Sequence, residues 1–276
     1  MSRFSIITPS YQASAWLKLC IASVADQGVD HEHIIQDSCW DDGTQNWLPQ
    51  DPRVKAFVEK DRGMYDAINR GIRRSTGEII AYLNADEQYL PGALKLVRQY
   101  FERHPQVDMV FGDVVMVNEN GDYLSHRKMQ VPLLYHTWTC HLSTLSCGMF
   151  FRRRLVEKDE MLFNADWRVS GDGEWMVRML QRGTRMGTLG EFASVFTVTG
   201  QNLGGSASAA EETRRLAQNA PPAVLRLRRL IILHHRLRRW LGACTRRTRF
   251  ATRFLRRKVL TKESGSKSRT RDSGRG

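Results

Sequence analysis

Short apolar runs alternate with amphipathic stretches through the first part of the chain. The runs Phe4–Thr8, Val54–Val58 and Ile79–Leu83 have the length and composition of buried parallel strands, and Ile34–Ile35 belongs to a further strand that ends at Asp37. Between these runs apolar residues recur at helical spacing, as in the group Trp16, Leu17, Cys20, Ile21 and Val24. This alternation predicts βαβ units and a mostly parallel sheet flanked by helices.

The pattern changes after residue 109. Met109–Val117, the turn sequence NENG and Tyr123–His126 predict a hairpin, and the segment 141–155 is expected to return one strand to the sheet. A short amphipathic helix is predicted over 172–182. The Gly- and Ser-rich segment 202–210 is expected to be a loop at the edge of the folded body, so residues 1–210 are predicted to form one α/β domain.

The C-terminal part of the chain has a different pattern. From Pro221 onward, leucines and isoleucines recur at helical spacing among many arginines, with Trp240 beside them. This predicts a basic amphipathic helical region over residues 211–260, of the kind that lies in the interface of an anionic membrane. Residues 261–276 are polar and poor in apolar side chains, which predicts a disordered tail.

The net charge of +13 comes entirely from this C-terminal part. Residues 1–220 hold 24 Lys/Arg and 27 Asp/Glu, a net charge of −3, whereas residues 221–276 hold 18 and 2, a net charge of +16. A nucleic-acid-binding protein would be basic over its folded body. No nucleic-acid partner is therefore expected, and nucleic-acid binding remains an alternative only for the Arg-rich tail.

Three further features of the sequence bear on its compartment. Five scattered cysteines without a CxxC pair indicate neither a zinc knuckle nor a disulfide framework. The chain starts almost at once into a strand, and it has no charge-free apolar run of roughly 20 residues. We expect a cytoplasmic protein that is peripheral on the inner face of the cell membrane.

Acidic and polar segments follow the predicted strands. TPSY, DSCWDDGT and NADE all fall at strand carboxyl ends, where ligands bind in open α/β sheets. Clustered carboxylates repel one another unless a cation compensates their negative charge. Mg²⁺ or Mn²⁺ with a diphosphate ligand would provide this compensation. Asp86 fits a metal ligand, and a helix N-cap or loop acid is an equally good interpretation of this residue alone.

Several segments resemble family 2 glycosyltransferases. SIITPSYQASAWLKLCIASVADQ, QDSCWDDGT and EKDRGMYDAINRGIRRSTGEIIAYLNADEQYLPGAL stand in the family's order and spacing, and CGMFFRRRLV and SGDGEWMVRML fit later pieces, so about residues 3–205 are covered. The resemblance implies a GT-A fold and an inverting transfer of sugar from a nucleotide-diphosphate-sugar donor to an acceptor hydroxyl. It also implies a glycan or lipid-linked acceptor, in cell-surface polysaccharide or lipid-linked glycan assembly.

The resemblance also implies roles for individual residues in binding the nucleotide sugar. Pro9 and Tyr11 match the loop that lies against the base and ribose, and Asp37 and Asp42 match the acids of the second loop. The family's turn and helix that approach the diphosphate and sugar are matched by Arg62, Asp66 and Asn69. Trp40 departs from the pattern, because it stands where the family usually has small residues.

The metal ligand and the catalytic base follow from the same resemblance. Asp86 matches the last acid of the family's DXD motif, so a divalent cation is expected, with Asn84 replacing the first acid and Glu87 as an additional candidate. Asp172 matches the catalytic base that deprotonates the acceptor hydroxyl, and Glu174 lies beside it on the same predicted helix. Without the resemblance, Asp172 would be interpreted as an acid stabilised by a helix N-terminus.

Alternative functions come from other classes. A nucleotidyltransferase of the same fold would show a GxGxR-type glycine-rich loop after the first strand, which TPSYQAS is not. A catalytically inactive GT-A-like scaffold is disfavoured because Asp42, Asp86 and Asp172 are all present. His141 and the run Arg152–Arg154 are weaker candidates for the acceptor side, with a structural histidine and a solvated charge run as the commoner outcomes.

Overall fold

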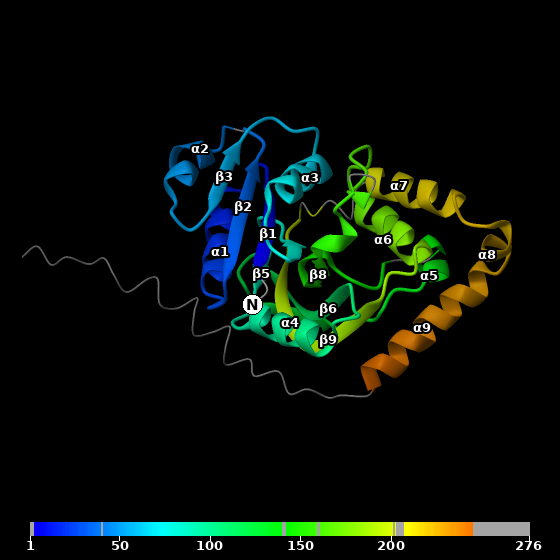
Figure 1. The fold of residues 1–276 in the computed structure, drawn as a ribbon. Helices are drawn as coiled ribbons and strands as arrows, with labels where there is room; N and C mark the ends of the chain where they lie inside the picture. Colours follow the sequence, from blue (N-terminus) through cyan, green and yellow to red (C-terminus); the bar gives the residue numbers. More distant parts are fainter. Residues whose placement is uncertain are drawn as a thin grey trace, which may run out of the picture.

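A computed structural model describes residues 3–39, 41–139, 142–158, 161–200, 202 and 207–244. Within this part of the chain, nine strands form one mixed sheet in the order β3-β2-β1-β4-β8-β6-β9-β5, with β7 paired to β6 (Figure 1). Helices cover the sheet, as predicted for an α/β fold. The predicted disordered tail, 261–276, lies outside the described residues, as do residues 245–260 of the predicted membrane-associated region.

The first half of the sheet is parallel. Its strands are β1 (Phe4–Ser10), β2 (His31–Asp37), β3 (Lys55–Val58) and β4 (Ile79–Tyr82), and their pairing is parallel throughout. The helices between and after them are α1 (Ser14–Ala25), α2 (Thr44–Trp47), α3 (Met64–Arg74) and α4 (Ala93–Arg103), with the short turn η1 (Leu48–Gln50). The four predicted strands are confirmed, and their carboxyl ends meet at one edge of the sheet.

The second half of the sheet adds antiparallel pairs. The predicted hairpin is confirmed as β6 (Met109–Asn118) and β7 (Tyr123–Arg127). The predicted returning strand is β8 (Met149–Arg152), which lies antiparallel between β4 and β6, preceded by η2 (Ser146–Gly148) and followed by η3 (Arg153–Leu155). Two strands were not predicted, β5 (Gln88–Tyr89) and β9 (Met186–Val198). In β9 the apolar residues are interrupted by glycine, glutamate and serine. The segment therefore shows neither strict alternation of apolar and polar residues nor a continuous apolar run, the two patterns that predict a strand.

Two close contacts show that α1 and α3 cover opposite faces of the sheet. Gly71 of α3 lies so near Ile7 that a Cβ on the glycine would stand 2.5 Å from the isoleucine side chain. The thiol of Cys20 on α1 lies 3.6 Å from the Thr8 hydroxyl. Neighbouring residues of a strand point to opposite faces of the sheet. Because Ile7 contacts α3 and Thr8 contacts α1, the two helices lie on opposite faces.

The C-terminal helices pack on the side of the molecule away from α1 and α2 (Figure 1). They are α6 (Gly171–Gln181), α7 (Ala207–Gln218), α8 (Pro222–Arg226) and α9 (Arg228–Cys244), and α5 (Leu134–Thr139) contacts all four. The predicted helix over 172–182 is confirmed. The loop expected over 202–210 is wrong for residues 207–210, which form the first turn of α7, because alanine and glutamate favour a helix there.

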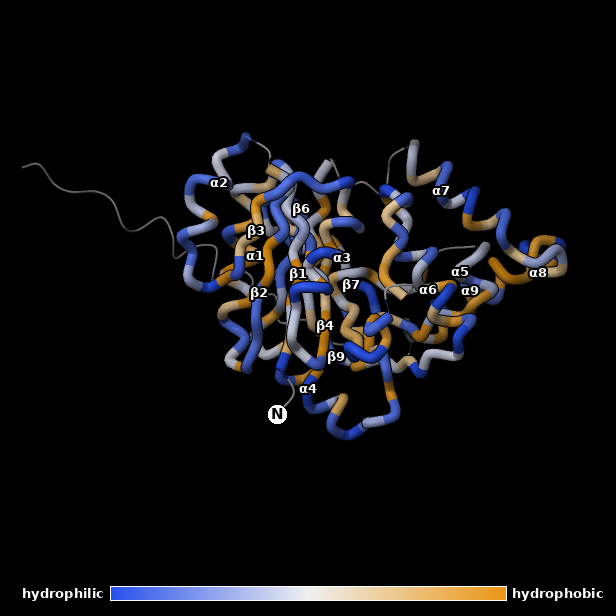
Figure 2. The backbone as a smooth tube through the Cα atoms, turned by 45° about the horizontal axis from the view of Figure 1, so that its top comes forward, coloured by the Kyte–Doolittle hydropathy of each residue, from blue (hydrophilic) through white to orange (hydrophobic). Residues whose placement is uncertain are grey.

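Within the predicted amphipathic region 211–260, the structure describes the helix α9, and membrane association of this region stays a prediction. Ile231 and His235 are buried against the body, and the imidazoles of His136 and His234 meet with their nitrogens 3.0 Å apart. The opposite side of the helix is exposed and apolar, with Leu230 and Trp240 among its residues. Figure 2 shows apolar and polar segments alternating along α9 at the edge of the molecule. No helix in the described ranges has both the length and the apolar character needed to cross a bilayer.

Candidate active site

The ends of β1 and β2 are joined by side chains. Ser10 donates a hydrogen bond to Oδ2 of Asp37 over 2.8 Å, and the amide of Cys39 donates to Oδ1 over 3.1 Å. Burial raises the pKa of Asp37 above its ordinary value. Pro9 lies within β1, and Tyr11 follows it with 58% of its surface exposed. An exposed aromatic ring beside a buried acid at a strand end is a suitable surface for a base and ribose.

Asp42 has a structural task in the same loop. Its carboxylate accepts the amide of Ser14, at the start of α1, over 3.1 Å and the amide of Thr44, at the start of α2, over 3.0 Å. Burial alone would raise the pKa of Asp42, but the hydrogen bonds from Thr44 and Ser14 outweigh it and lower the pKa. The carboxylate therefore holds two helix starts, and its predicted contact with the nucleotide has no separate geometric support.

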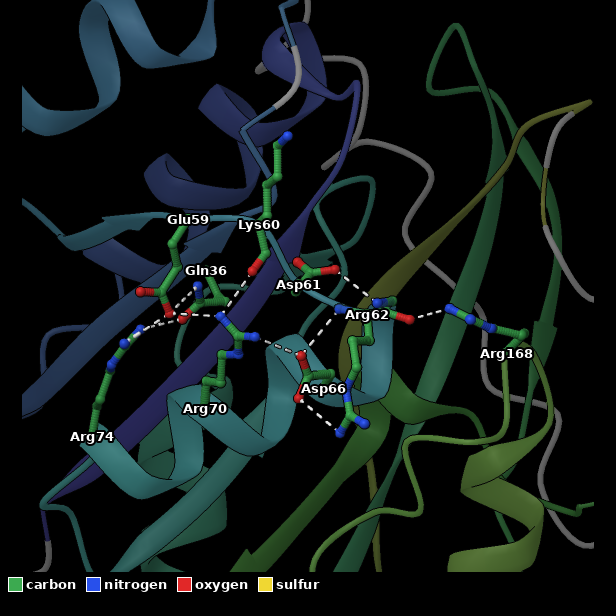
Figure 3. Close-up of polar contacts among 10 residues, drawn as sticks. Gln36, Glu59, Lys60, Asp61, Arg62, Asp66, Arg70, Arg74 and Arg168 are labelled. Carbon is green, nitrogen blue, oxygen red and sulfur yellow. Dashed lines mark hydrogen bonds and ion pairs between the residues drawn. The ribbon is translucent and has the colours of Figure 1, made fainter.

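The segment between β3 and α3 forms a turn built on two acids (Figure 3). Asp61 accepts the amide of Gly63 over 2.8 Å, and Asp66 accepts the amide of Arg62 over 3.1 Å. Asp66 also pairs with Arg70 at 2.9 Å and lies 3.7 Å from the Arg62 guanidinium. The Arg62 side chain is 72% exposed, so a phosphate can approach its guanidinium.

Further charged residues on α3 and at the end of β3 support this turn. Arg70 binds Glu59 at 3.1 Å and the carbonyl oxygen of Lys60 at 2.9 Å, and Arg74 binds Glu59 at 2.8 Å (Figure 3). Gln36 of β2 donates to the same glutamate over 3.2 Å. The network ties α3 to the end of β3 and so fixes the turn that carries Arg62.

Asn69 faces away from this turn. Its side-chain amide donates to the carbonyl oxygen of Phe163 over 2.7 Å, and its oxygen accepts the Phe163 amide over 2.9 Å. Asn69 is only 5% exposed. These contacts give it a structural role between α3 and the segment before α6, and its predicted contact with the donor finds no support in the geometry.

Asp86 follows β4 and lies close to one late loop residue. The amide of Asn202 approaches its Oδ2 at 3.3 Å, and burial raises the pKa of Asp86. Two residues earlier, Oδ1 of Asn84 is buried and has no hydrogen-bond partner among the residues that the structure describes. A carboxylate and an unpartnered amide oxygen are the hard ligands that Mg²⁺ and Mn²⁺ prefer, so this pair fits a divalent cation.

The cation would need further ligands from outside the protein. Within the described residues, no group of three or more His, Cys, Asp and Glu side chains is arranged to hold a metal ion. This agrees with Mg²⁺ sites that use one or two protein oxygens and take the rest from phosphates and water. Glu87 is buried and accepts the amide of Asn84 over 2.8 Å, so it supports the turn from behind. Burial and the neighbouring Asp86 charge raise the pKa of Glu87 to about 8.

Asp172 stands at the start of α6 and is held by Tyr65 from α3. The Tyr65 hydroxyl accepts the Asp172 amide over 3.0 Å and lies 3.4 Å from Oδ1 of the same residue. Oδ1 also accepts the amide of Gly173 over 2.8 Å. A side chain at Gly171 would place its Cβ 2.6 Å from the Tyr65 ring, so glycine is required for this approach. Burial raises the pKa of Asp172, which makes its carboxylate a stronger base.

Four acids of the region share one electrostatic property. Burial is the largest cause of a raised pKa at Asp37, Asp61, Asp86 and Asp172. The charges of Asp37 and Asp66 further raise the pKa of Asp61. Raised carboxylate pKa values that gather at strand ends and a helix start are typical of sites that receive a cationic ligand or transfer a proton.

The structure also places the weaker candidates. Arg152 and Arg153 donate to the backbone carbonyls of Val107 and Gly77, and Arg154 pairs with Asp108 at 2.6 Å, so the run is structural. Trp40 and His141 lie outside the described residues. Asp61 and Tyr65 were not predicted, although both stand within the quoted DRGMYD segment. The Asx-turn signal of an aspartate before glycine could have found Asp61, whereas the contacts of Tyr65 with Asp172 lie 107 residues away.

A mixed sheet whose parallel half ends in an acid-lined edge defines an α/β enzyme of GT-A type. The model of glycosyl transferase family 2 matches residues 5–160, which is more than half of the chain. The chain therefore belongs to glycosyl transferase family 2.

Two curated relatives illustrate the family. A PGL/p-HBAD biosynthesis glycosyltransferase of Mycobacterium tuberculosis is 30% identical over 182 residues, which are 63% of this chain and 68% of the relative. A putative teichuronic acid biosynthesis glycosyltransferase of Bacillus subtilis, TuaG, is 36% identical over 91 residues, covering 31% of this chain and 36% of the relative.

Solved structures show the same fold. Residues 1–349 of S. aureus TarS in complex with UDP-GlcNAc align with a TM-score of 0.63 at 18% identity, over 84% of this chain and 66% of that one. The mannosyltransferase PcManGT of Pyrobaculum calidifontis, in complex with GDP-Man and Mn²⁺, aligns with a TM-score of 0.56 at 19% identity, over 83% and 68%. This chain spans less than two thirds of the length of the TarS structures.

Proposed function

We propose that the protein moves a sugar from a nucleotide-diphosphate sugar to an acceptor hydroxyl with inversion of the anomeric centre. The observation that carries the proposal is the position of Asp172. Its carboxylate lies at a helix start and contacts Tyr65 of α3, the helix that begins at the Arg62 turn. The base and the donor-binding turn thus share one rigid support.

The donor would lie across the carboxyl edge of β1 to β4. Pro9, Tyr11 and Asp37 would contact the base and ribose, since they line the ends of β1 and β2. The exposed Arg62 guanidinium would bind the diphosphate, with Asp66 orienting it. TarS and PcManGT are described with UDP-GlcNAc and GDP-Man, which supports a nucleotide-sugar donor here.

A divalent cation would be held by Asp86 together with the Oδ1 atom of Asn84. When bound there, Mg²⁺ or Mn²⁺ supplies charge that stabilises the departing nucleoside diphosphate. Mn²⁺ in the PcManGT complex supports this assignment. Asn202 donates to Asp86 and would orient its carboxylate toward the ion.

Asp172 would take the proton from the acceptor hydroxyl as the hydroxyl attacks the anomeric carbon. The proton moves to the carboxylate, a bond forms from the acceptor oxygen to the sugar, and the bond to the diphosphate oxygen breaks. Tyr65 keeps the carboxylate in place through its contacts with the Asp172 amide and Oδ1. A positioned general base contributes about 10²–10⁴-fold to such a reaction.

The acceptor would be a glycan or a lipid-linked sugar, handled in the cytoplasm at the inner face of the cell membrane. The exposed side of α9 carries Leu230, Leu233, Leu237, Trp240 and Leu241. The helix contains five arginines and no acid. An apolar stripe on a purely cationic helix complements an anionic lipid surface. The relatives named for PGL/p-HBAD and teichuronic acid biosynthesis support a role in surface-glycan assembly.

The donor site is tested by calorimetric titration with UDP, GDP and dTDP, each with and without Mn²⁺. We expect one nucleotide to bind in a Mn²⁺-dependent manner. The variant Asp86→Ala should lose that dependence, while Glu102→Ala, an exposed acid on α4, should retain it. Failure of all three nucleotides to bind under every condition would exclude the proposed donor site.

A further inference from the structure

Glu212 of α7 binds three consecutive backbone amides just before α6. Its Oε1 accepts the amide of Arg168 over 2.6 Å, and its Oε2 accepts the amides of Val169 and Ser170 over 2.9 and 2.7 Å. Ser170 is the N-cap residue of α6, and its own side chain makes no capping hydrogen bond. A carboxylate from another helix therefore satisfies the donors at the entrance to α6.

The same short segment is held from its other side by α3. The Tyr65 hydroxyl donates to the carbonyl oxygen of Val169 over 2.8 Å, while the Val169 amide donates to Glu212. The peptide groups on the two sides of Val169 are thus fixed by two side chains that come from distant parts of the sequence. Three residues after Val169, Tyr65 also accepts the amide of Asp172. Glu212 and Tyr65 together determine where α6 begins and where the Asp172 carboxylate lies.

The segment also reaches the donor side. The Arg168 guanidinium donates to the carbonyl oxygen of Arg62 in the DRG turn (Figure 3). The Arg168 amide is bound by Glu212, so one residue connects α7 to the turn that carries the exposed Arg62 side chain. The Glu212 carboxylate thus holds both the residue that contacts the donor turn, Arg168, and the residue at the start of the helix that carries the base, Ser170.

We propose that Glu212 is a positioning residue for glycosyl transfer, which holds the segment 168–170 and thereby fixes the Asp172 carboxylate against the donor turn. The inference rests on the proposed function of Asp172. It also assigns α7 to the catalytic machinery, although residue 212 falls within the region that the sequence analysis assigned to membrane association.

Other contacts keep α7 in place without this carboxylate. Leu216 is buried and packs against the position of Gly173, where an added Cβ would lie 3.4 Å from it. The Arg215 guanidinium lies over the Trp167 ring at 4.9 Å. Neutralising Glu212 therefore removes the restraint on 168–170 while α7 remains docked, so a loss of function would report positioning rather than unfolding.

The charge of Glu212 also acts on the base. Burial is the main cause of the raised pKa of Asp172, and the Glu212 charge raises it further, while the hydrogen bond from Tyr65 lowers it. The Asp172 charge also acts on Tyr65 and on Tyr82 of β4, whose pKa values it raises. Removing the Glu212 charge is thus expected to lower the pKa of Asp172.

The test compares Glu212→Gln with Glu211→Gln, which removes the same charge one residue earlier on an exposed site of α7. Carboxyl ¹³C titration, assigned with Asp172→Asn, gives the pKa of Asp172 in each protein. Amide hydrogen exchange measures protection of residues 168–170, and circular dichroism confirms that each variant is folded. Nucleoside diphosphate release from UDP-GlcNAc, UDP-glucose and GDP-mannose, with water as acceptor, gives kcat and KM.

We expect Glu212→Gln to lower the pKa of Asp172, to speed exchange at 168–170 at least tenfold, and to reduce kcat at least tenfold with KM within twofold. Glu212→Asp, which keeps the charge on a shorter side chain, should restore part of kcat. The inference would be overturned if Glu212→Gln had the same Asp172 pKa, or the same kcat, as Glu211→Gln. If the wild-type protein releases nucleotide from no donor, the proposed function fails, and the Asp172 titration still decides whether Glu212 fixes the carboxylate.

Discussion

The acids of the donor side and the acid of α6 are held in different ways. Asp37, Asp42 and Asp61 each accept an amide two residues further along the chain, at Cys39, Thr44 and Gly63. This is the local Asx-turn arrangement that aspartate favours. Asp172 instead depends on Tyr65, 107 residues away, and its segment depends on Glu212, more than 40 residues away. Each of these three acids therefore has a local turn, to which Asp37 and Asp42 add longer-range bonds with Ser10 and Ser14. The position of Asp172 depends more on tertiary packing, although its carboxylate also accepts the neighbouring amide of Gly173.

This difference has an energetic consequence. A local Asx turn forms at little cost in chain entropy, so the donor loops tolerate changes elsewhere in the molecule. The base requires α3, α6 and α7 to be docked at once. Variants that loosen α6 or α7 should reduce turnover and leave nucleotide binding unchanged, whereas loosening α3 should affect both. The following predictions can break this separation.

The largest effect is expected at Asp172. Asp172→Asn keeps the shape of the side chain and removes the base, so kcat should fall about 10²–10⁴-fold. The affinity for nucleotide, measured by calorimetry, should not change. Asp166→Asn, an exposed acid six residues earlier, is the matched control. Equal turnover in the two variants would show that another group accepts the proton.

The pH profile of the wild-type enzyme sharpens the same prediction. The base works only when Asp172 is ionised, and burial raises its pKa above the ordinary value of 3.8. Activity should therefore be retained above the raised pKa and fall as pH decreases through it. An acidic limb of kcat/KM at or below pH 3.8 would mean that the buried environment of Asp172 does not set the profile.

The sequence and the structure agree most closely where structure is local. The parallel strands and the hairpin follow from apolar runs and turn residues, and these predictions are confirmed. The pairing of Asp86 with Asn202 and the capping of α6 by Glu212 connect residues more than 40 positions apart. No periodicity or motif encodes such contacts, because they depend on how the second half of the sheet and α7 pack.

A smaller effect is expected at Asn69, and it tests whether this residue belongs to the donor side. Asn69→Ala would leave the buried amide and carbonyl of Phe163 without partners, which should cost about 2–3 kcal/mol of unfolding free energy. Nucleotide affinity should remain within twofold of wild type. Gln50→Ala, an exposed amide, should change neither quantity. Lost nucleotide affinity with unchanged stability would instead favour the donor contact that the family resemblance implies.

The smallest effect is expected at the exposed side of α9, which neither the donor turn nor the base contacts in our assignment. Leu233→Ser with Leu237→Ser should weaken binding to vesicles of phosphatidylglycerol and phosphatidylethanolamine about tenfold, because the two leucines together lose apolar burial of roughly 1.5 kcal/mol. Leu124→Ser on β7, also exposed, should have no effect on vesicle binding. Binding that falls with salt yet ignores both leucines would mean that the arginines act alone. Loss of turnover without vesicles in the α9 variant would show that this helix, like α7, supports the base.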